Sequence, residues 1–448
     1  MSSDTPPVVP NYRLLRRLGR GGYGEVWLGI HNDLEQPRAI KSLRPGRFSA
    51  TAVERLVREA RIMARLPPHR NRVQIHDLIR TEVGAFLIMQ YVEGGSLHAR
   101  GILPWEKAAR YVGDVADALH EVHAQGILHR DIKPANILWD QVRNEALLAD
   151  FGLAGAADGP DGGTPGYIAP EILDAVSPKC DVFSLAATFY ALVAGAAPFA
   201  TSSLRESIAD AAAGPQRLVA ALDSLPRGLR DTILAGLEPD PDVRPSLDEF
   251  VHRIRGAHLQ TLADQLQALS RRQGANVRLD IAVQTSPDPA TPFRPATWEQ
   301  GTIDEGQGSG EAIPVASARI GDLVRLEIGA DADGYLTVLN LGSAGDLQVI
   351  FPNPQKRDNH IFAGQRHRLT VRVEPPAGTD RAAVIWTRAP NALTPEEWWV
   401  RIEAGQLLAA PATEATRALA FVLHEVEEQA GDAWCAKVIA VSHKAAPE

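Results

Sequence analysis

Hydrophobic residues in the first half of the chain form short unbroken runs in some places and recur at helical spacing in others. The run over residues 86 to 89 has the length of one buried strand, and Gly94 and Gly95 end it. A long amphipathic helix is predicted past Pro104, and a nearly wholly apolar helix over residues 182 to 193.

A shorter amphipathic helix is predicted between residues 51 and 66. Its apolar stripe contains Leu56, Met63 and Leu66, and Glu59 shares that stripe at offsets of three, four and seven. Glu59 therefore faces the same way as the apolar side, and we expect it to pair with Lys41. The alternative is a solvent-exposed pair with one of the arginines of the same helix.

The second half of the chain changes from helical spacing to alternation. Leucines at helical spacing after Gly256 predict a closing helix that ends near Gly274, and alternation over residues 277 to 283 predicts a strand. Residues 286 to 310 are rich in Pro, Gly, Thr and acidic residues, the composition of a flexible connector or a long loop. From residue 315 onward, short alternating stretches predict a small β-sandwich or open sheet. The other elements expected there are helices near residues 394–397 and over 413–429, and a last strand over 434–441.

Composition narrows the class of protein. The chain has 448 residues, 45% hydrophobic and 23% charged, enough for two or three ordinary domains. Its net charge of -9 argues against a nucleic-acid or anionic-membrane binder. Cys180 and Cys435 are too few for a disulfide framework, and no apolar run is long enough to span a bilayer. We therefore expect a cytoplasmic protein without a membrane span, with a disordered leader over residues 1–11.

Candidate chemistry is concentrated in the stretch His129-Arg130-Asp131-Ile132-Lys133-Pro134-Ala135-Asn136, which Asp150-Phe151-Gly152 follows. In phosphoryl transfer, Asp131 can accept or orient a hydroxyl proton, and Lys133 can neutralise charge on the moving phosphate. Asn136 and Asp150 can hold Mg²⁺ on a nucleotide. A His-Arg-Asp triplet alone could be a surface charge cluster, but the length of the combined pattern argues against that.

A glycine-rich stretch near the N-terminus predicts a second part of the site. Its predicted nucleotide-contacting residues are Gly19, Arg20, Gly21, Gly22, Gly24 and Val26. Glycines let backbone amides approach phosphate oxygens where a side chain would intrude. A dinucleotide-binding turn has the same spacing but needs a later acidic residue that is not found here, whereas Ala39-Ile40-Lys41 follows on a short apolar strand. We expect Ala39 to line the nucleotide site and Lys41 to hold its α and β phosphates, with Glu59 as the partner of Lys41.

The strand over residues 86 to 89 leads to the predicted adenine site. Met89 is expected at the back of the pocket, and backbone groups near Gln90 and Val92 are expected to form the hydrogen bonds to adenine. Core packing alone would also explain Met89.

Together these motifs resemble bacterial serine/threonine protein kinases of the eukaryotic type, over residues 12–255. Lys133-Pro134 is similar to the serine/threonine branch rather than the tyrosine branch. The resemblance implies an α+β class with a bilobal protein-kinase fold. It also implies ATP and Mg²⁺ as cofactors, and phosphorylation of Ser and Thr hydroxyls on proteins, including the chain itself. The physiological protein substrate is unknown.

The resemblance also implies structural roles for residues outside the catalytic set. Residues 163–171 match the segment where the family docks the acceptor peptide, and Glu171 in it is implied to pair with Arg244. Asp181 is implied to brace the catalytic loop, and Thr164 to hydrogen-bond the catalytic Asp and Lys.

The stretch from residue 153 to 163 contains no serine, threonine or tyrosine. Kinases of this type commonly use the arginine before the catalytic aspartate, here Arg130, to bind a phosphorylated residue in this segment. We hypothesise that Asp158 or Asp161, or contacts that depend on the C-terminal domain, hold the segment instead. The alternative is that both aspartates are solvated turn residues.

Residues 315–445 resemble a bacterial β-rich family of unknown function. We therefore expect a small sandwich-like domain with helices that binds a protein or ligand and regulates or targets the phosphorylation. Residues 256–314 are assigned to the closing helix and linker. A pseudokinase would be expected to lack Lys41, Asp131 or Asp150, and a small-molecule phosphotransferase has no need of residues 163–171. A third alternative stays open, in which binding through the C-terminal domain is the main function and phosphorylation only self-regulates.

Overall fold

The computed structural model describes residues 6–20, 24–43, 50–81, 84–151, 164–173, 175–199, 203–271, 277–296, 298–299, 315–343, 347–351, 359–373, 378–388, 409–410 and 434–444. The chain forms two compact units, Met1–Ile254 and Arg255–Glu448. No helix in these described ranges is long and apolar enough to cross a membrane.

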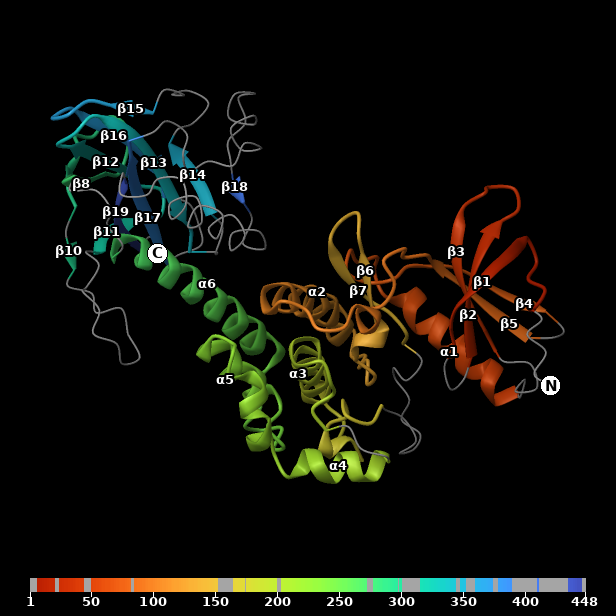
Figure 1. The fold of residues 1–448 in the computed structure, drawn as a ribbon. Coiled ribbons are helices and arrows are strands. Elements are labelled where there is room, and N and C mark those ends of the chain that lie inside the picture. The colour runs from red at the N-terminus through yellow and green to blue at the C-terminus, as the bar shows by residue number, and fades with distance from the viewer. Residues whose placement is uncertain are drawn as a thin grey trace. The chain divides into compact units, whose positions relative to one another are not determined.

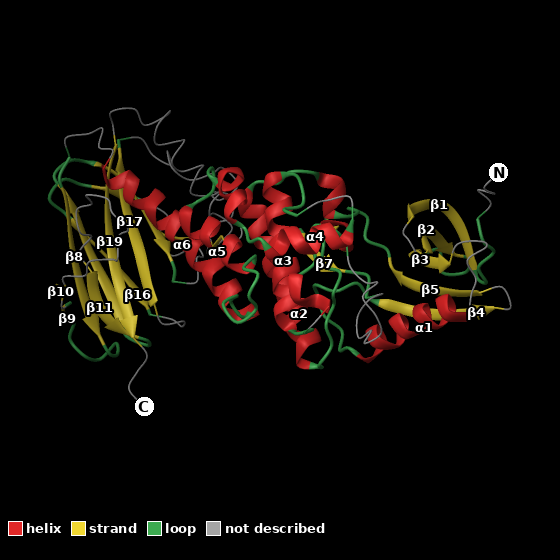
Figure 2. Cartoon of the chain, turned by 90° about the horizontal axis from the view of Figure 1, so that it is seen from below, coloured by secondary structure: helices red, strands yellow, loops and turns green. Residues whose placement is uncertain are grey.

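The first unit begins with a five-stranded antiparallel sheet in the order β1-β2-β3-β5-β4. Its strands are β1 (Tyr12–Arg20), β2 (Gly24–His31), β3 (Pro37–Leu43), β4 (Ile75–Thr81) and β5 (Gly84–Gln90). Helix α1 (Ala50–Arg65) lies along β4 and β5, as both ribbon views show (Figure 1 and Figure 2). Leu56 and Ala60 of this helix bury against Leu43 and Leu87 of the sheet, so the predicted apolar stripe does face the sheet.

The rest of the first unit is mainly helical. Its helices are α2 (Trp105–Ala124), α3 (Pro178–Ala194), α4 (Leu204–Ala212) and α5 (Arg227–Gly236). Short 3₁₀ turns are η1 (Leu97–Arg100), η2 (Pro134–Asn136), η3 (Pro170–Leu173) and η4 (Gln216–Leu222), and one hairpin joins β6 (Ile137–Asp140) to β7 (Glu145–Leu148). A sheet lobe followed by a helical lobe confirms the predicted bilobal α+β fold.

Helix α3 lies at the centre of the helical lobe, between α2 and α5 (Figure 2). Every residue from Cys180 to Leu192 is buried, which explains why the sequence is apolar on all sides of this helix. The Ser177 hydroxyl caps its N-terminus by accepting the Lys179 N–H at 3.3 Å. Gly195 ends it at a φ of 85°, a left-handed conformation that favours glycine. The local sequence therefore determines where α3 begins and ends. The burial of its apolar side chains places the helix at the centre of the lobe.

The second unit is a β-sandwich of two sheets. The larger sheet has the order β10-β11-β19-β17-β13-β14-β18, with β15 also paired to β13, and the smaller has the order β16-β12-β8-β9. The larger sheet contains β10 (Trp298–Glu299), β11 (Val315–Arg319), β13 (Gly334–Leu341), β14 (Leu347–Phe351), β15 (His360–Ile361), β17 (Gly378–Thr387), β18 (Ala409–Ala410) and β19 (Trp434–Lys444). The smaller contains β8 (Leu279–Ser286), β9 (Arg294–Pro295), β12 (Leu323–Ala330) and β16 (Arg366–Arg372). Both sheets contribute to one core, in which Leu326 and Ile328 pack with Val338 and Trp386.

Two features of this unit differ from the sequence analysis. Strand β8 lies within the range assigned to the linker, yet it pairs with β12 along its whole length and buries Leu279 and Val283 in the sandwich core. The closing helix α6 (Leu247–Arg271) begins before Gly256 instead of after it. A glycine inside a helix costs only about 1 kcal/mol, so Gly256 is not a sufficient break. The helices predicted near residue 394 and over 413–429 lie outside the described residues.

Candidate active site

Asp181, in the first turn of α3, fixes the start of the catalytic loop. Its carboxylate accepts the backbone N–H groups of His129 and Arg130 at 2.9 and 2.8 Å and lies 2.8 Å from Nε2 of His123. Burial alone would raise the pKa of Asp181, but the hydrogen bond from His123 and the backbone donors hold it below its ordinary value. A buried charge at a helix N-terminus therefore organises the loop backbone, as the resemblance implied.

His129 joins this loop to the residues before Asp150. Its Nδ1 accepts the N–H of Asp131 at 3.3 Å, and its Nε2 lies 3.1 Å from the carbonyl oxygen of Ala149. Accepting at Nδ1 and donating at Nε2 requires the neutral ring. Burial lowers the pKa of His129, which favours that neutral form, and the ring packs edge-on against Phe151 with centroids 4.7 Å apart.

The predicted catalytic residues meet in one hydrogen-bond network around Asp131. Its Oδ2 accepts Nζ of Lys133 at 2.7 Å and Nδ2 of Asn136 at 2.9 Å, while its Oδ1 accepts the hydroxyl of Thr164 at 2.7 Å. Nζ of Lys133 also lies 2.5 Å from that hydroxyl. The catalytic loop and the start of the acceptor-docking segment are therefore connected through two side chains.

Lys41 lies in a second cluster with Glu59 and Asp150. Its Nζ is 2.8 Å from both carboxylate oxygens of Glu59 and 2.8 Å from Oδ1 of Asp150. The side chain of Glu59 is 3% exposed, so its charge depends on this partner. The partner predicted for Lys41 is thus the one found in the structure, and the solvent-exposed alternative for Glu59 is wrong.

The ionisation of this cluster follows from burial and from its unequal charges. Burial would lower the pKa of Lys41, but the carboxylates of Asp150 and Glu59 raise it above its ordinary value. Burial raises the pKa of Glu59 to about 7, against the opposing effect of the Lys41 ammonium. The Lys41 ammonium is shared by the carboxylates of Glu59 and Asp150, so Glu59 binds a proton more readily than an ordinary glutamate does.

Two residues of the site, Arg130 and Asp150, have strained backbone conformations. Arg130 and Asp150 adopt φ values of 66° and 64°, in the left-handed region that non-glycine residues rarely occupy. Each such residue costs about 1 kcal/mol or more. Surrounding contacts such as those of Asp181 and Lys41 offset this cost and aim the two side chains.

The glycine-rich hairpin is described only in part. Gly21 and Gly22 lie outside the described residues. A Cβ at Gly24 would lie 2.5 Å from the carbonyl oxygen of Ser42, so β2 and β3 approach too closely for any side chain there. A Cβ at Gly19 would meet nothing within 4 Å.

The remaining residues predicted to line the nucleotide lie on strands β1 to β3. Nε of Arg20 lies 3.4 Å from Oε1 of Glu25, so this guanidinium pairs across the hairpin. Val26 lies opposite Lys41 in the β2–β3 register, and Ala39 is buried. The nucleotide contacts predicted for Arg20, Val26 and Ala39 stay predictions.

The predicted adenine hinge follows β5. Met89 packs against the core of the sheet lobe and also against Val92 and Leu147. The backbone N–H of Gln90 donates to the carbonyl oxygen of Gln74 at 2.8 Å. That amide is therefore already used, which leaves the backbone at Val92 as the better candidate donor for adenine.

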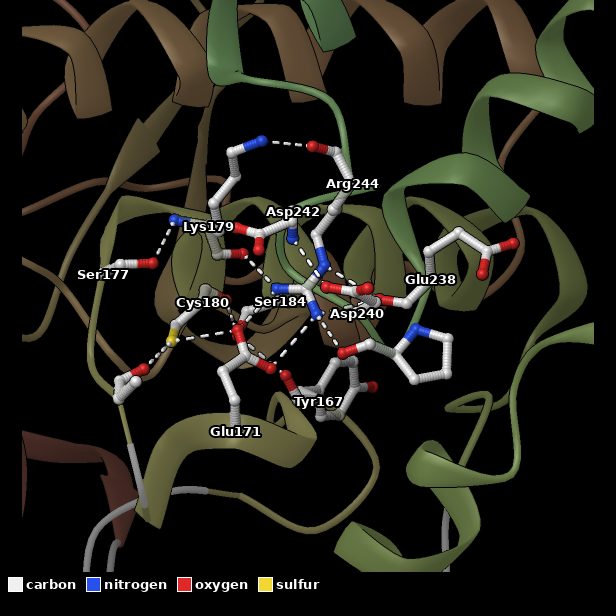
Figure 3. Close-up of polar contacts among 12 residues, drawn as sticks. Tyr167, Glu171, Ser177, Lys179, Cys180, Ser184, Glu238, Asp240, Asp242 and Arg244 are labelled. Carbon is white, nitrogen blue, oxygen red and sulfur yellow. Dashed lines mark hydrogen bonds and ion pairs between the residues drawn. The ribbon is translucent and has the colours of Figure 1, made fainter.

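Glu171, which is partly buried, and Arg244, which is fully buried, form an ion pair beside the segment predicted to dock the acceptor (Figure 3). Nη1 and Nη2 of Arg244 lie 2.7 and 3.1 Å from the two carboxylate oxygens of Glu171. The same guanidinium donates to the carbonyl oxygens of Lys179 at 2.7 Å and Glu238 at 2.8 Å. This bidentate pair joins the docking segment to α3 and to the loop before α6, as the resemblance implied.

Three residues of this region were not identified from the sequence. The thiol of Cys180 lies 3.3 Å from Oε1 of Glu171, and burial raises its pKa to about 12, so it stays a protonated donor (Figure 3). The hydroxyl of Ser184 lies 2.7 Å from the carbonyl oxygen of Tyr167, and that of Ser207 accepts the N–H of Gly166 at 2.7 Å. A serine inside the apolar stretch 182–193 was a signal for Ser184. No spacing marks Ser207, because its contact is between distant parts of the chain.

Asp158 and Asp161 were proposed to hold the stretch from residue 153 to 163. Asp158, Asp161 and Gly152 lie outside the described residues.

Two known protein families match the chain, one within each of its two units. Residues 12–254 match the model of the protein kinase domain, and residues 317–390 match a domain of unknown function, DUF4384. The second match lies within the β-sandwich, where a β-rich family of unknown function was expected.

Curated relatives match mainly the first unit. The serine/threonine-protein kinase PkaA of Streptomyces coelicolor is 32% identical over 312 residues, which cover 63% of this chain and 56% of the relative. CBL-interacting protein kinase 15 of Oryza sativa subsp. japonica is 30% identical over 266 residues, which cover 56% of this chain and 60% of the relative. The chain thus spans less than two thirds of the length of these relatives.

Proposed function

Since the chain belongs to the protein kinase family, we propose that it transfers the γ-phosphoryl group of ATP to serine and threonine hydroxyls of proteins, including its own. The observation that carries the proposal is the network around Asp131, in which Lys133, Asn136 and Thr164 hold one carboxylate by three side chains. The names of the relatives and the Lys133-Pro134 pair support Ser and Thr as acceptors.

The residues present fit Mg²⁺ and a nucleotide. Because Nδ2 of Asn136 donates to both the carbonyl and the carboxylate of Asp131, these contacts do not use its amide oxygen, whose lone pairs can coordinate a cation. That oxygen and the Asp150 carboxylate are the hard ligands that Mg²⁺ prefers, and Mg²⁺ usually binds through one or two such residues together with substrate phosphates. The bound ion would neutralise charge on the β and γ phosphates.

The remaining residues act by position and charge. Lys41, held by Glu59, would contact the α and β phosphates, with Asp150 beside it. Asp131 would accept the proton of the acceptor hydroxyl as its oxygen bonds to phosphorus and the bond to the ADP oxygen breaks. The Lys133 ammonium would stabilise the negative charge on the transferred group.

Two rivals fit the structure less well. A pseudokinase would lack part of the machinery, whereas Lys41, Asp131 and Asp150 are present with their hydrogen-bond partners. A small-molecule phosphotransferase would not need an acceptor-docking segment anchored by Glu171 and Arg244. We also propose that the C-terminal sandwich binds a protein or ligand and thereby regulates or targets the kinase unit. A further part of the proposal is that the protein works in the cytoplasm.

The test is a transfer assay with radiolabelled ATP, Mg²⁺ and a generic basic protein, using the full chain beside Asp131→Asn. We expect phosphoserine and phosphothreonine on the acceptor with the wild type and a loss of transfer with the variant. Phosphotyrosine alone, or equal transfer by both proteins, would contradict the proposal.

A further inference from the structure

A buried hydroxyl on α4 contacts the acceptor-docking segment. Ser207 is 0% exposed, and its Oγ accepts the backbone N–H of Gly166 at 2.7 Å. Gly166 has a φ of 93°, which favours glycine, and its backbone also bridges to Phe199. The position of this peptide group is therefore set from α4 and from the chain just before it.

Gly166 is close in sequence to a residue of the catalytic network. Thr164, two residues earlier, contacts both Asp131 and Lys133 through its hydroxyl. The N–H of Tyr167 donates to the carbonyl oxygen of Thr164 at 3.1 Å, so residues 164–167 form one tight turn. A displacement of Gly166 within this turn is passed to Thr164.

The opposite side of the same turn is held by α3. The hydroxyl of Ser184 lies 2.7 Å from the carbonyl oxygen of Tyr167. Two serines from two helices thus hold the adjacent residues Gly166 and Tyr167 by backbone groups. The backbone of the docking turn is therefore held from both α3 and α4.

We propose that Ser207 is a positioning residue for the phosphoryl acceptor: it holds Gly166, and through the 164–167 turn it aligns the docked peptide with Asp131. The inference rests on the proposed kinase function and adds to it a residue from outside the catalytic loop. Ser207 contacts the docking turn and not the Lys41 cluster, so its loss should affect the acceptor and leave the nucleotide site unchanged.

The experiment compares four variants of the full chain with the wild type. Ser207→Ala removes the acceptor oxygen, Ser207→Cys nearly keeps the size but accepts weakly, and Ser207→Thr keeps the hydroxyl. Ser203→Ala is the matched control, because the Ser203 hydroxyl caps the same helix by accepting the Glu206 N–H at 3.2 Å. Each protein is assayed for peptide KM and kcat, for ATP affinity, and for ATP hydrolysis without a peptide. Hydrogen exchange is measured on the segment 164–170.

We expect Ser207→Ala and Ser207→Cys to lower kcat/KM for the peptide by about tenfold or more, the factor expected for one buried hydrogen bond. ATP affinity should be unchanged, because the Lys41 cluster does not contact the turn. ATP hydrolysis should fall less than peptide transfer, because water needs no docked peptide, and exchange over residues 164–170 should be faster. Ser207→Thr should retain most of the activity, and Ser203→Ala should retain wild-type peptide kinetics.

Unchanged peptide kinetics in Ser207→Cys would overturn the proposal, as would an equal loss of peptide transfer and ATP hydrolysis. If Ser207→Ala does not fold, the test compares kcat/KM for the peptide in Ser207→Cys and Ser207→Thr. The proposal requires a loss in Ser207→Cys and not in Ser207→Thr. A wild type that transfers no phosphate would instead overturn the kinase function, and the two failures are therefore distinguishable.

Discussion

Lys41 lies within hydrogen-bond distance of two acids, Glu59 and Asp150, in the candidate nucleotide site. The charge of this cluster therefore depends on whether Glu59 is protonated. Glu59 has a raised pKa, about 7, because it is buried and shares its one cation with another acid. Asp131 is held by different donors and belongs to a separate network. Substitutions in the two networks should therefore have different effects.

Asp131→Asn should lower kcat for transfer by about a hundredfold or more, because it removes the group that accepts the hydroxyl proton. Nucleotide affinity should change little, since Asp131 does not contact Lys41. Lys41→Met and Asp150→Asn should instead reduce both transfer and nucleotide affinity. Steady-state kinetics and a nucleotide-binding titration check both statements, and turnover by Asp131→Asn close to the wild type would refute this division of roles.

Glu59→Gln should alter how stability depends on pH. Between about pH 4.5 and 7 the folded protein keeps a proton on Glu59 that the unfolded chain has released. Glu59 therefore contributes most to stability at the low end of this range, and the contribution is lost as pH rises through 7. Gln cannot titrate, so the melting temperature of the variant should rise relative to the wild type from pH 5 to pH 8. Thermal melts across that range measure the difference, and parallel curves would contradict the raised pKa.

At the scale of elements, the acceptor-docking segment depends on α3 and on the loop that precedes α6. Arg244 is fully buried and donates to Glu171, Lys179 and Glu238 at once. Its fork geometry cannot be reproduced by a point charge. The segment should therefore be sensitive to a change that keeps the charge.

Arg244→Lys should destabilise the kinase unit by about 3 kcal/mol or more, because it leaves the Glu171 carboxylate and several carbonyl groups poorly paired. Phosphoryl transfer to peptides should also fall in this variant. Arg227→Lys is the matched control, because Arg227 and Asp231 form an exposed pair that contributes at most about 1 kcal/mol. Denaturant midpoints for the two variants check the contrast, and equal midpoints would refute it.

The local pattern of hydrophobic and polar residues predicted most of the helices and strands. It did not predict contacts between residues that are far apart in the sequence. The stripe of α1 predicted the Lys41 partner because Glu59 shares a face with Leu56, a property of neighbouring residues. The contact of Ser207 with Gly166 has no such local signal. Alternation over 277–283 predicted the strand β8, but its pairing with β12 is a contact between distant segments that no spacing indicates.

At the scale of the whole molecule, we propose from the pairing of β8 with β12 that the C-terminal domain begins before residue 315. A piece that begins at residue 315 lacks one neighbour of β12 and the core residues Leu279 and Val283. Residues 277–448 should therefore fold alone, whereas 315–448 should not. Circular dichroism and dispersed amide resonances distinguish the two pieces, and a folded 315–448 would show that β8 is dispensable.

The complementary piece, residues 1–275, keeps the whole of α6 and all of the first unit. It should fold and phosphorylate a generic basic protein without the rest of the chain. An insoluble or inactive piece would show that the kinase unit needs the second unit for its stability.

Strand β19 has a consequence for how the protein is made. It lies between β11, to which it is parallel, and β17, to which it is antiparallel, yet it is the last of the described strands to leave the ribosome (Figure 1). Until it emerges, the facing edges of β11 and β17 have no partner, whereas the kinase unit is already complete. A ribosome stalled before residue 434 should thus carry a folded kinase unit beside an open, aggregation-prone sheet. During synthesis, phosphoryl-transfer machinery would then precede the domain proposed to direct it.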